Sequence, residues 1–103
     1  MKIENIEKDI EVIDIHFHTK FNNSSDYERM LTRAVKLNEE VGELCEAVLH
    51  ENNEQRDDKK GIDFGGEVAD VIISTLMLAR MKNIDVWGEV QKKLVKIKER
   101  NNI

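Results

Sequence analysis

The sequence predicts an all-α fold, a four-helix bundle that forms a single domain spanning residues 1–103 and oligomerises through its helices. Proline is absent, 36% of the residues are charged and only 5% are aromatic, a composition that favours helices over a sheet with tight turns. Apolar residues also recur every three or four positions along most of the chain. The length suffices for one core, and an oligomer would help to bury the remaining apolar faces.

The first helix is predicted from about Ile3 to about His18, with a break at Phe21–Ser24. Its apolar face consists of Ile3, Ile6, Ile10, Ile13 and Phe17. Ser25 to Glu28 has the form of a capping box, in which the Ser25 hydroxyl and the Glu28 carboxylate each accept a hydrogen bond from an otherwise unpaired amide. A second helix therefore starts there and continues to about His50. Its broad apolar arc consists of Met30, Ala34, Leu37, Val41, Leu44, Cys45 and Val48.

The third and fourth helices follow a polar connection that runs from Glu51 to Lys60 and makes the second and third helices antiparallel neighbours. We place the third helix from about Asp63 to Lys82, where Asn83 suits a C-terminal cap. Asp85 can cap the start of the fourth helix. The apolar side chains expected to face inward on this last helix are Trp87, Val90, Leu94 and Ile97.

The overall charge argues against several functional classes. A formal net charge of -5 and a pI near 5.2 do not suit a surface that neutralises nucleic-acid phosphates. The exception is a basic patch that can meet a small anion, formed by Lys92, Lys93, Lys96, Lys98 and Arg100. Cys45 is the only cysteine, and its apolar context predicts a buried thiol in a reducing compartment. With a charged N-terminus and no apolar stretch long enough to span a bilayer, we expect a cytoplasmic protein without membrane contact.

Two groups of carboxylates lie on the second and third predicted helices. Glu39, Glu40 and Glu43 occur in the segment EEVGE, and Glu67 and Asp70 occur in EVAD. Asp70 is the only charge between Val68 and Ala79. A helix that is apolar nearly all round is normally buried, and an ionised carboxylate in a core costs several kcal/mol unless it is compensated. A divalent cation bound by carboxylate oxygens would provide that compensation.

Helical geometry allows the two groups to form one site. Glu40 and Glu43 lie about 60° apart on their helix with Lys36 between them, and Glu67 and Asp70 are likewise about 60° apart with Ser74 between them. Glu39 points farther round, toward Glu46. When residues are counted from the ends of the two helices, the Glu40–Glu43 pair could be offset from the Glu67–Asp70 pair by several ångströms along the helix axes.

The chemistry of the donors indicates the metal. Oxygen-only ligands select Mg²⁺ or Mn²⁺, and bound Mg²⁺ keeps positions for water and for substrate phosphate oxygens. The ExxD spacing alone carries little information, because it also occurs at Glu11–Asp14 and Glu54–Asp57. Two alternatives are a di-iron bundle, which needs a histidine that neither motif has, and a purely structural bundle, in which Asp70 would be replaceable by leucine.

EEVGE followed by EVADV, on two helices of a small acidic chain, resembles the MazG-like all-α nucleoside triphosphate pyrophosphohydrolases, a superfamily that includes dimeric dUTPases and phosphoribosyl-ATP pyrophosphohydrolases. The resemblance covers roughly Met30 to Arg100. It implies Mg²⁺-dependent hydrolysis of a nucleoside triphosphate to the monophosphate and pyrophosphate. The metal ligands it implies are Glu40, Glu43, Glu67 and Asp70. Glu39 would be a further ligand or would orient the attacking water, and a ligand carboxylate such as Glu40 would help to deprotonate the water.

The resemblance also implies cations for the pyrophosphate and assembly as a homodimer or homotetramer, because relatives of this size pair their helices between subunits. The candidate cations are Lys36, Lys93, Lys96 and Arg100. Many relatives have an asparagine in this basic tail, whereas Ile97 follows Lys96 here. Candidates for contact with a nucleobase are His16, Phe17, His18, Phe21 and Trp87, although Phe17 and Trp87 also suit a core. The alternative function is a non-catalytic helical module that binds nucleotides or a regulatory partner.

Overall fold

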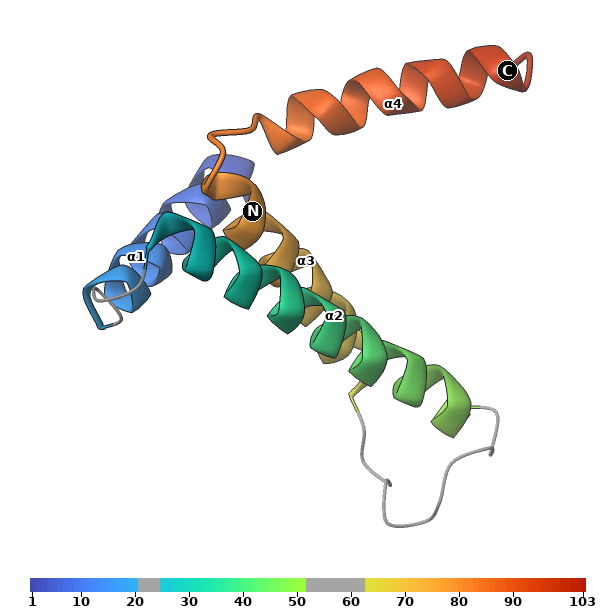
Figure 1. Cartoon of the computed structure of the whole chain (residues 1–103). Helices are drawn as coiled ribbons and strands as arrows, with labels where there is room; N and C mark the ends of the chain where they lie inside the picture. Colours follow the sequence, from blue (N-terminus) through green and yellow to red (C-terminus); the bar gives the residue numbers. More distant parts are fainter. Residues whose placement is uncertain (21–24, 52–62) are drawn as a thin grey trace.

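The structure, a computed structural model, describes residues 1–20, 25–51 and 63–103. These residues form four helices, α1 (Ile3–Lys20), α2 (Asp26–Glu51), α3 (Phe64–Arg80) and α4 (Val86–Arg100), and contain no strand (Figure 1). The all-α prediction is therefore confirmed, and the predicted helix ends differ from the observed ones by two residues at most. Residues 21–24 and most of the predicted polar connection lie outside the described residues. None of the described helices combines the length and apolar character needed to cross a membrane.

The predicted capping box is present at the start of α2. The Ser25 hydroxyl accepts a hydrogen bond from the Glu28 amide at 3.1 Å, and the Glu28 carboxylate accepts one from the Ser25 amide at 3.4 Å. Two amides at the beginning of the helix are thus satisfied by side chains. This fixes where α2 begins and with it the position of every later residue around the helix.

The turn from α3 to α4 depends on Asn83, as the sequence predicts. Asn83 has a φ of 52°, in the left-handed region that asparagine tolerates well. Its amide donates to the Arg80 carbonyl at 3.1 Å, and the Ile84 amide donates to the Ala79 carbonyl at 3.4 Å, which is the Schellman pattern. Asp85 then caps α4 by accepting a hydrogen bond from the Gly88 amide at 3.2 Å.

The α2–α3 pair runs antiparallel, and α1 crosses the C-terminal half of α3 (Figure 1). The core lies at this crossing, where Ile10 of α1 packs with Leu76 and Met77 of α3. Trp87, at the start of α4, packs against the same cluster together with Ile6 and Val86. This cluster is therefore small and sits at one end of the α2–α3 pair, whereas Ala47 of α2 is buried apart from it.

A network of charged groups holds α1 to α2 and α3 beside this core. Asp14 of α1 forms an ion pair with Arg33 of α2, and it accepts a hydrogen bond from Arg80 Nε of α3 at 2.7 Å. Arg33 also donates to the Met77 carbonyl at 2.9 Å. Burial tends to raise the pKa of Asp14, but the hydrogen bonds and charges of the two arginines outweigh it and hold the pKa below its ordinary value of 3.8.

Several expectations about burial are wrong within the described residues. Cys45 is exposed rather than buried. The inward face predicted for the last helix is exposed beyond Trp87, since Val90, Leu94 and Ile97 are 40–52% accessible. On α1 only Ile10 of the predicted apolar face is buried. In each case the helix forms as predicted, but the rest of the described chain covers only part of its apolar face.

Candidate functional site: a four-carboxylate cluster

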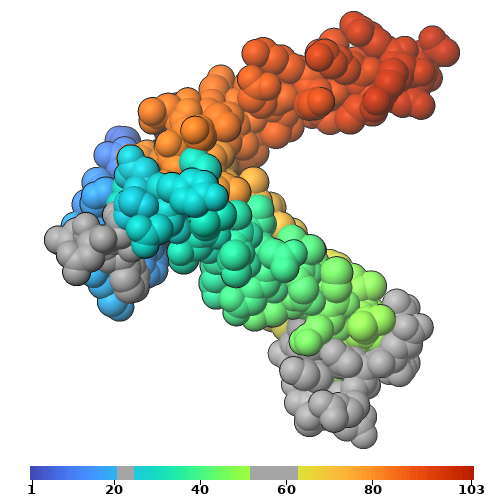
Figure 2. Space-filling view, viewed as in Figure 1, coloured from blue at the N-terminus to red at the C-terminus, as the bar shows by residue number. Residues whose placement is uncertain are grey.

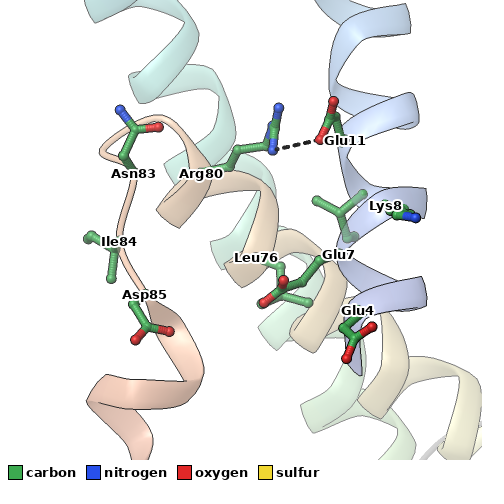
Figure 3. A pocket seen from close by; sticks show the side chains of 10 residues that line it. Glu4, Glu7, Lys8, Glu11, Leu76, Arg80, Asn83, Ile84 and Asp85 are labelled. Atoms are coloured by element: carbon green, nitrogen blue, oxygen red, sulfur yellow. Dashed lines mark ion pairs between the residues drawn. The ribbon is translucent and has the colours of Figure 1, made fainter. Parts of the chain in front are cut away.

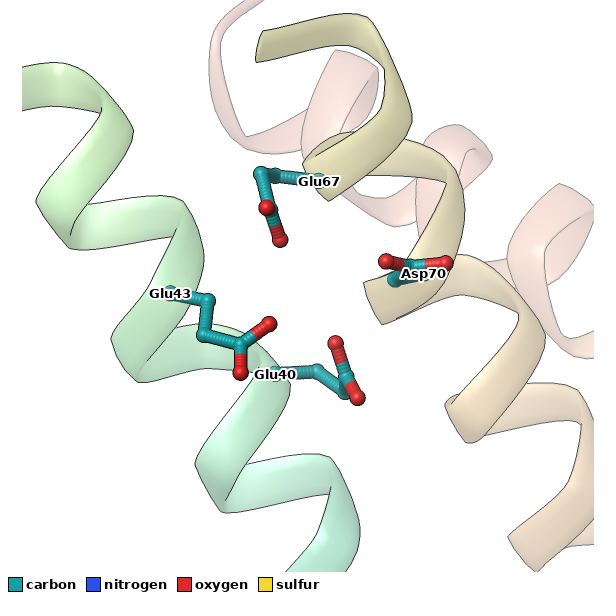
Figure 4. A group of neighbouring side chains, drawn as sticks. All are labelled: Glu40, Glu43, Glu67 and Asp70. Carbon is teal, nitrogen blue, oxygen red and sulfur yellow. The ribbon is translucent and has the colours of Figure 1, made fainter. Parts of the chain in front are cut away.

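The structure brings together Glu40 and Glu43 of α2 with Glu67 and Asp70 of α3 (Figure 4). Each contributes one carboxylate oxygen to a group whose members all lie within 4.8 Å of one another. Figure 4 shows the four side chains pointing into the space between the two helices. The within-helix spacing of three residues thus places each pair on the face that meets the neighbouring helix.

The two pairs come level because α2 extends beyond the start of α3. Glu43 precedes the end of α2 by eight residues, whereas Glu67 follows the start of α3 by only three. At 1.5 Å per residue, this difference amounts to roughly 7 Å of helix. The offset predicted by counting residues therefore separates the ends of the two helices, whereas the two carboxylate pairs lie at the same level.

Burial differs among the four side chains. Glu40 is 7% accessible, Glu43 and Glu67 are half-buried, and Asp70 is exposed. The prediction that Asp70 is buried in an apolar helix is therefore wrong. The reason is that α1 contacts α3 at Leu76 and Met77, nearer its C-terminal end, and the cluster that Asp70 joins with α2 is open to solvent on the side of Asp70.

The cluster contains carboxylate oxygens that the protein itself does not satisfy. Glu40 Oε2 and Glu67 Oε2 are both buried and have no hydrogen-bond partner. The pKa of Glu43 is raised, first by the negative charge of Glu40 and then by burial and by the charges of Glu67 and Glu39. Buried polar atoms are normally paired. An oxygen-only donor set with unpaired oxygens and mutual repulsion fits a hard divalent cation such as Mg²⁺ or Mn²⁺.

Lys36 is the cation closest to the cluster among the ion pairs of the described residues. Its Nζ lies 3.1 Å from Glu40 Oε1 and 3.6 Å from Glu39 Oε1. The hydrogen bond to Glu40, followed by the charges of Glu39 and Glu40, raises the pKa of Lys36. The Lys36 and Glu39 side chains are 56% and 57% accessible. Both therefore lie at the edge of the cluster, where they can reach a bound molecule.

A hollow of about 560 Å³ opens next to Lys36 between α1, α2 and α3. Ile13 and Phe17 of α1 and Ile73 and Met77 of α3 form its apolar wall. Ser74, one helical turn after Asp70, also lines it. The sequence gave Phe17 as a candidate for contact with a nucleobase and Lys36 as a candidate for contact with phosphate. It gave no signal that Ile73 and Met77 would join them, because three separate helices build the hollow.

The remaining aromatic and histidine candidates lie elsewhere. Trp87 packs against the core, and His16 contacts the Phe17 ring edge-on with the centroids 5.4 Å apart. His18 lines a different hollow, together with Asp14. Phe21 lies outside the described residues.

The predicted basic residues of α4 are not brought to the carboxylates within one chain. Lys93, Lys96 and Arg100 are exposed, and α4 projects away from the α2–α3 pair (Figure 1). Another hollow, of about 600 Å³, lies between α1 and the turn from α3 to α4 (Figure 3). Acidic side chains, among them Glu4, Glu7 and Asp85, line it, so it does not suit a triphosphate.

Comparison with known proteins gives one match. The family model of the MazG nucleotide pyrophosphohydrolase domain matches residues 28–103. The matched region contains all four carboxylates of the cluster, Lys36 and the whole of α4. No curated protein and no solved structure matches the chain.

Proposed function

This chain belongs to the MazG nucleotide pyrophosphohydrolase family, and from this premise we propose that it hydrolyses a nucleoside triphosphate to the monophosphate and pyrophosphate with the help of Mg²⁺ or Mn²⁺. One observation carries the proposal. Four carboxylates from two helices place their oxygens within 4.8 Å of one another, and two of those carboxylates keep a buried oxygen without a partner. Such an arrangement is unfavourable in a purely structural pair of helices.

In this proposal Glu40, Glu43, Glu67 and Asp70 hold the metal. When bound, a divalent cation would polarise the phosphoryl oxygens and neutralise charge that develops on the triphosphate. Asp70 is the exposed member of the cluster, so the open side of the site lies next to it. The triphosphate would approach from that side.

The chain's own groups supply the proton transfer. Water attacks a phosphorus of the triphosphate, a carboxylate accepts its proton, and the bond between the α- and β-phosphates breaks to release pyrophosphate. We assign the proton to Glu40, a carboxylate of the cluster, with Glu39, which is exposed at the edge of the cluster, as the neighbouring carboxylate that orients the water. Lys36 lies within 3.6 Å of both residues and would exchange its carboxylate partners for a phosphate oxygen.

The nucleoside part of the substrate would occupy the hollow beside Lys36. Its volume of about 560 Å³ falls in the range of small-molecule sites, and its wall is mainly apolar. Phe17 offers a ring for stacking on a base. Lys36 and Ser74 line the hollow and are each four residues from a cluster carboxylate on the same helix, so one molecule can span the hollow and the cluster.

The proposal is tested by incubating the protein with a panel of ribo- and deoxyribonucleoside triphosphates and Mg²⁺, and measuring pyrophosphate. We expect release with at least one substrate, and a loss of about 100-fold or more in Glu67→Gln. In Glu39→Gln we expect turnover to fall while the thermal shift produced by Mg²⁺ stays as in the wild type.

The same panel separates the non-catalytic alternative. Saturable binding of a nucleotide in calorimetry without any pyrophosphate would identify a binding module. If Mg²⁺ and Mn²⁺ fail to bind even with a non-hydrolysable triphosphate present, the assignment of the cluster as a metal site is wrong.

A further inference from the structure

The polar lining of the hollow beside Lys36 consists mainly of hydrogen-bond donors. No carboxylate of the described residues lines this hollow, whereas the other two hollows described above are each lined by two or more carboxylates. Arginine and lysine side chains donate hydrogen bonds and accept none. In a chain with a formal net charge of -5, three cations in one hollow indicate a ligand group that accepts hydrogen bonds. The polar lining residues are Arg29, Thr32, Arg33, Lys36 and Ser74.

The positions of the three cations along α2 relate them to the carboxylate cluster. They lie in one row that leads to Glu40, because the successive spacings of Arg29, Arg33, Lys36 and Glu40 are four, three and four residues. Lys36 precedes Glu40 by about 6 Å along the helix axis, and Arg33 precedes it by about 10 Å. In Figure 2 the teal first half of α2 meets the blue α1 and the orange end of α3, the three helices that enclose the hollow. A nucleotide with its phosphates at the cluster would therefore place its sugar beside Lys36 and its base beside Arg33.

Two contacts hold the Arg33 guanidinium in place. One terminal nitrogen donates to the Met77 carbonyl at 2.9 Å, and the other forms an ion pair with Asp14. Asp14 also pairs with Arg80, so one negative charge is shared by two positive ones. The Arg33 side chain is 13% accessible. A guanidinium has further N–H groups beyond the two used here, and because Arg33 lines the hollow, they can donate to a molecule bound in it.

Thr32 supplies an acceptor in the same lining. Its hydroxyl donates to the Glu28 carbonyl at 2.9 Å, which leaves the lone pairs of the hydroxyl oxygen for a donor in the hollow. The lining thus combines a fixed guanidinium donor with a neutral hydroxyl acceptor. This combination is complementary to a ring carbonyl that lies next to a ring N–H.

Nucleobases differ in the group that would face Arg33. Uracil and thymine carry a carbonyl at C4, and guanine and hypoxanthine carry one at C6, each next to a ring N–H. Cytosine and adenine carry an amino group at the same positions. Arginine typically pairs with a base carbonyl, whereas the amino group of cytosine is recognised by Asp or Glu and that of adenine by Asn or Gln. Among the described residues, none of these four side-chain types lines the hollow.

We propose that the site selects nucleoside triphosphates whose base has a carbonyl at C4 of a pyrimidine or at C6 of a purine, and that Arg33 makes this selection by donating a hydrogen bond to that carbonyl. The inference rests on the proposed function, which places the nucleoside in this hollow. Thr32 accepts a hydrogen bond from the adjacent ring N–H. An amino group would instead meet the guanidinium donor to donor, and an unmatched polar pair in such a site lowers affinity about 10- to 100-fold.

Two pairs of substrates test the selection, because the members of each pair differ only at this edge of the base. In each pair that the protein hydrolyses, we expect kcat/KM to favour the carbonyl base by about 10-fold or more, so that dUTP exceeds dCTP and dITP exceeds dATP. An equal or opposite preference in a hydrolysed pair overturns the proposal.

Calorimetry with non-hydrolysable α,β-imido analogues and Mg²⁺ measures the same preference as a ratio of Kd values. Selective binding without any release of pyrophosphate from the natural triphosphates refutes the proposed function and supports the selection. Hydrolysis with equal kcat/KM and Kd values within each pair supports the proposed function and refutes the selection. If no analogue binds, both proposals are refuted.

Arg33→Gln tests the selecting residue. A glutamine amide can present either its N–H or its carbonyl, so the ratio of kcat/KM values within each pair should fall to about 1. Arg80→Gln is the matched control, because it also removes a guanidinium from Asp14 but lies outside this hollow, and its ratio should equal that of the wild type. A folded Arg33→Gln variant that keeps the wild-type ratio overturns the role of Arg33.

Thr32→Val is a second variant at an exposed position, so it does not depend on the helix contacts that Arg33 makes. It removes the acceptor for the ring N–H and should lower kcat/KM for dUTP roughly 10-fold, with a smaller loss for dCTP. An equal loss for the two substrates contradicts the proposed recognition of the base.

Discussion

Replacing Glu67 by glutamine should stabilise the protein without metal and weaken the stabilisation that metal provides. The Glu67 and Glu40 carboxylates present oxygens no more than 4.8 Å apart. At that distance two unit charges repel by roughly 1 kcal/mol in the dielectric of water and roughly 3 kcal/mol at an effective dielectric of 20. Glu40 is buried and Glu67 half-buried, so we expect Glu67→Gln to stabilise the metal-free fold by about 1–3 kcal/mol.

Thermal melts in EDTA and in excess Mg²⁺ measure both effects. For a domain of this size 1 kcal/mol corresponds to about 4–8 °C in Tm, so the variant should melt several degrees above wild type in EDTA. At a concentration one hundred times its Kd, the metal adds about 2.7 kcal/mol to the free energy of unfolding of the wild type. We expect Glu67→Gln to lose most of that gain. The lead of the variant in melting temperature should therefore shrink or reverse when Mg²⁺ is added.

The matched control is Glu7→Gln, which removes the same charge from an exposed position on α1. It should change neither the melt in EDTA nor the response to Mg²⁺. The reasoning is refuted if Glu67→Gln melts no higher than wild type in EDTA and gains as much from Mg²⁺ as wild type does.

Three further changes test other parts of the structure. Lys36→Met should raise KM for the triphosphate roughly 10-fold, a loss of about 1.4 kcal/mol, without reducing the thermal shift with Mg²⁺; an unchanged KM contradicts its contact with phosphate. Phe17→Ala should raise KM with only a small change in Tm, because Phe17 is 42% exposed in the wall of the hollow; an unchanged KM removes the hollow as the nucleoside site. Asp14→Asn should cost about 1.5–3 kcal/mol near neutral pH. Because the folded-state pKa of Asp14 is lowered, its stabilisation is present above pH 3.8 and is lost as the pH falls through the folded pKa, so equal acid sensitivity of urea unfolding in the two proteins contradicts this role.

Sequence reasoning succeeded where the determining interactions are local. The capping box at Ser25 and the turn at Asn83 fix the helix ends through neighbouring residues. Once these are set, the three-residue spacing of Glu40 and Glu43, and of Glu67 and Asp70, fixes which carboxylates share a face. The cluster could therefore be predicted from two helices and their connection.

The failures concern which part of the molecule covers each apolar face. The pattern of Val90, Leu94 and Ile97 predicts that α4 has an apolar face to bury, but an apolar pattern does not specify whether the cover comes from the same chain or from another copy. Cys45 and Asp70 were placed in a core for the same reason and are exposed in the single chain. The hollow next to Lys36 was not foreseen because Ile13, Ile73 and Met77 become neighbours only when three helices pack.

The two ends of the α2–α3 pair have opposite electrostatic character, and this links folding to the proposed chemistry. At one end, Arg33 donates to the Met77 carbonyl and, with Arg80, surrounds Asp14, so that unlike charges join three helices. At the other end, like charges face each other across the two helices, and Glu40 and Glu67 keep buried oxygens unpaired. The first end can hold the helices together while the second end repels. The carboxylate cluster can therefore remain assembled before a cation binds, which preorganises the ligands at a cost in stability that the arginine network offsets.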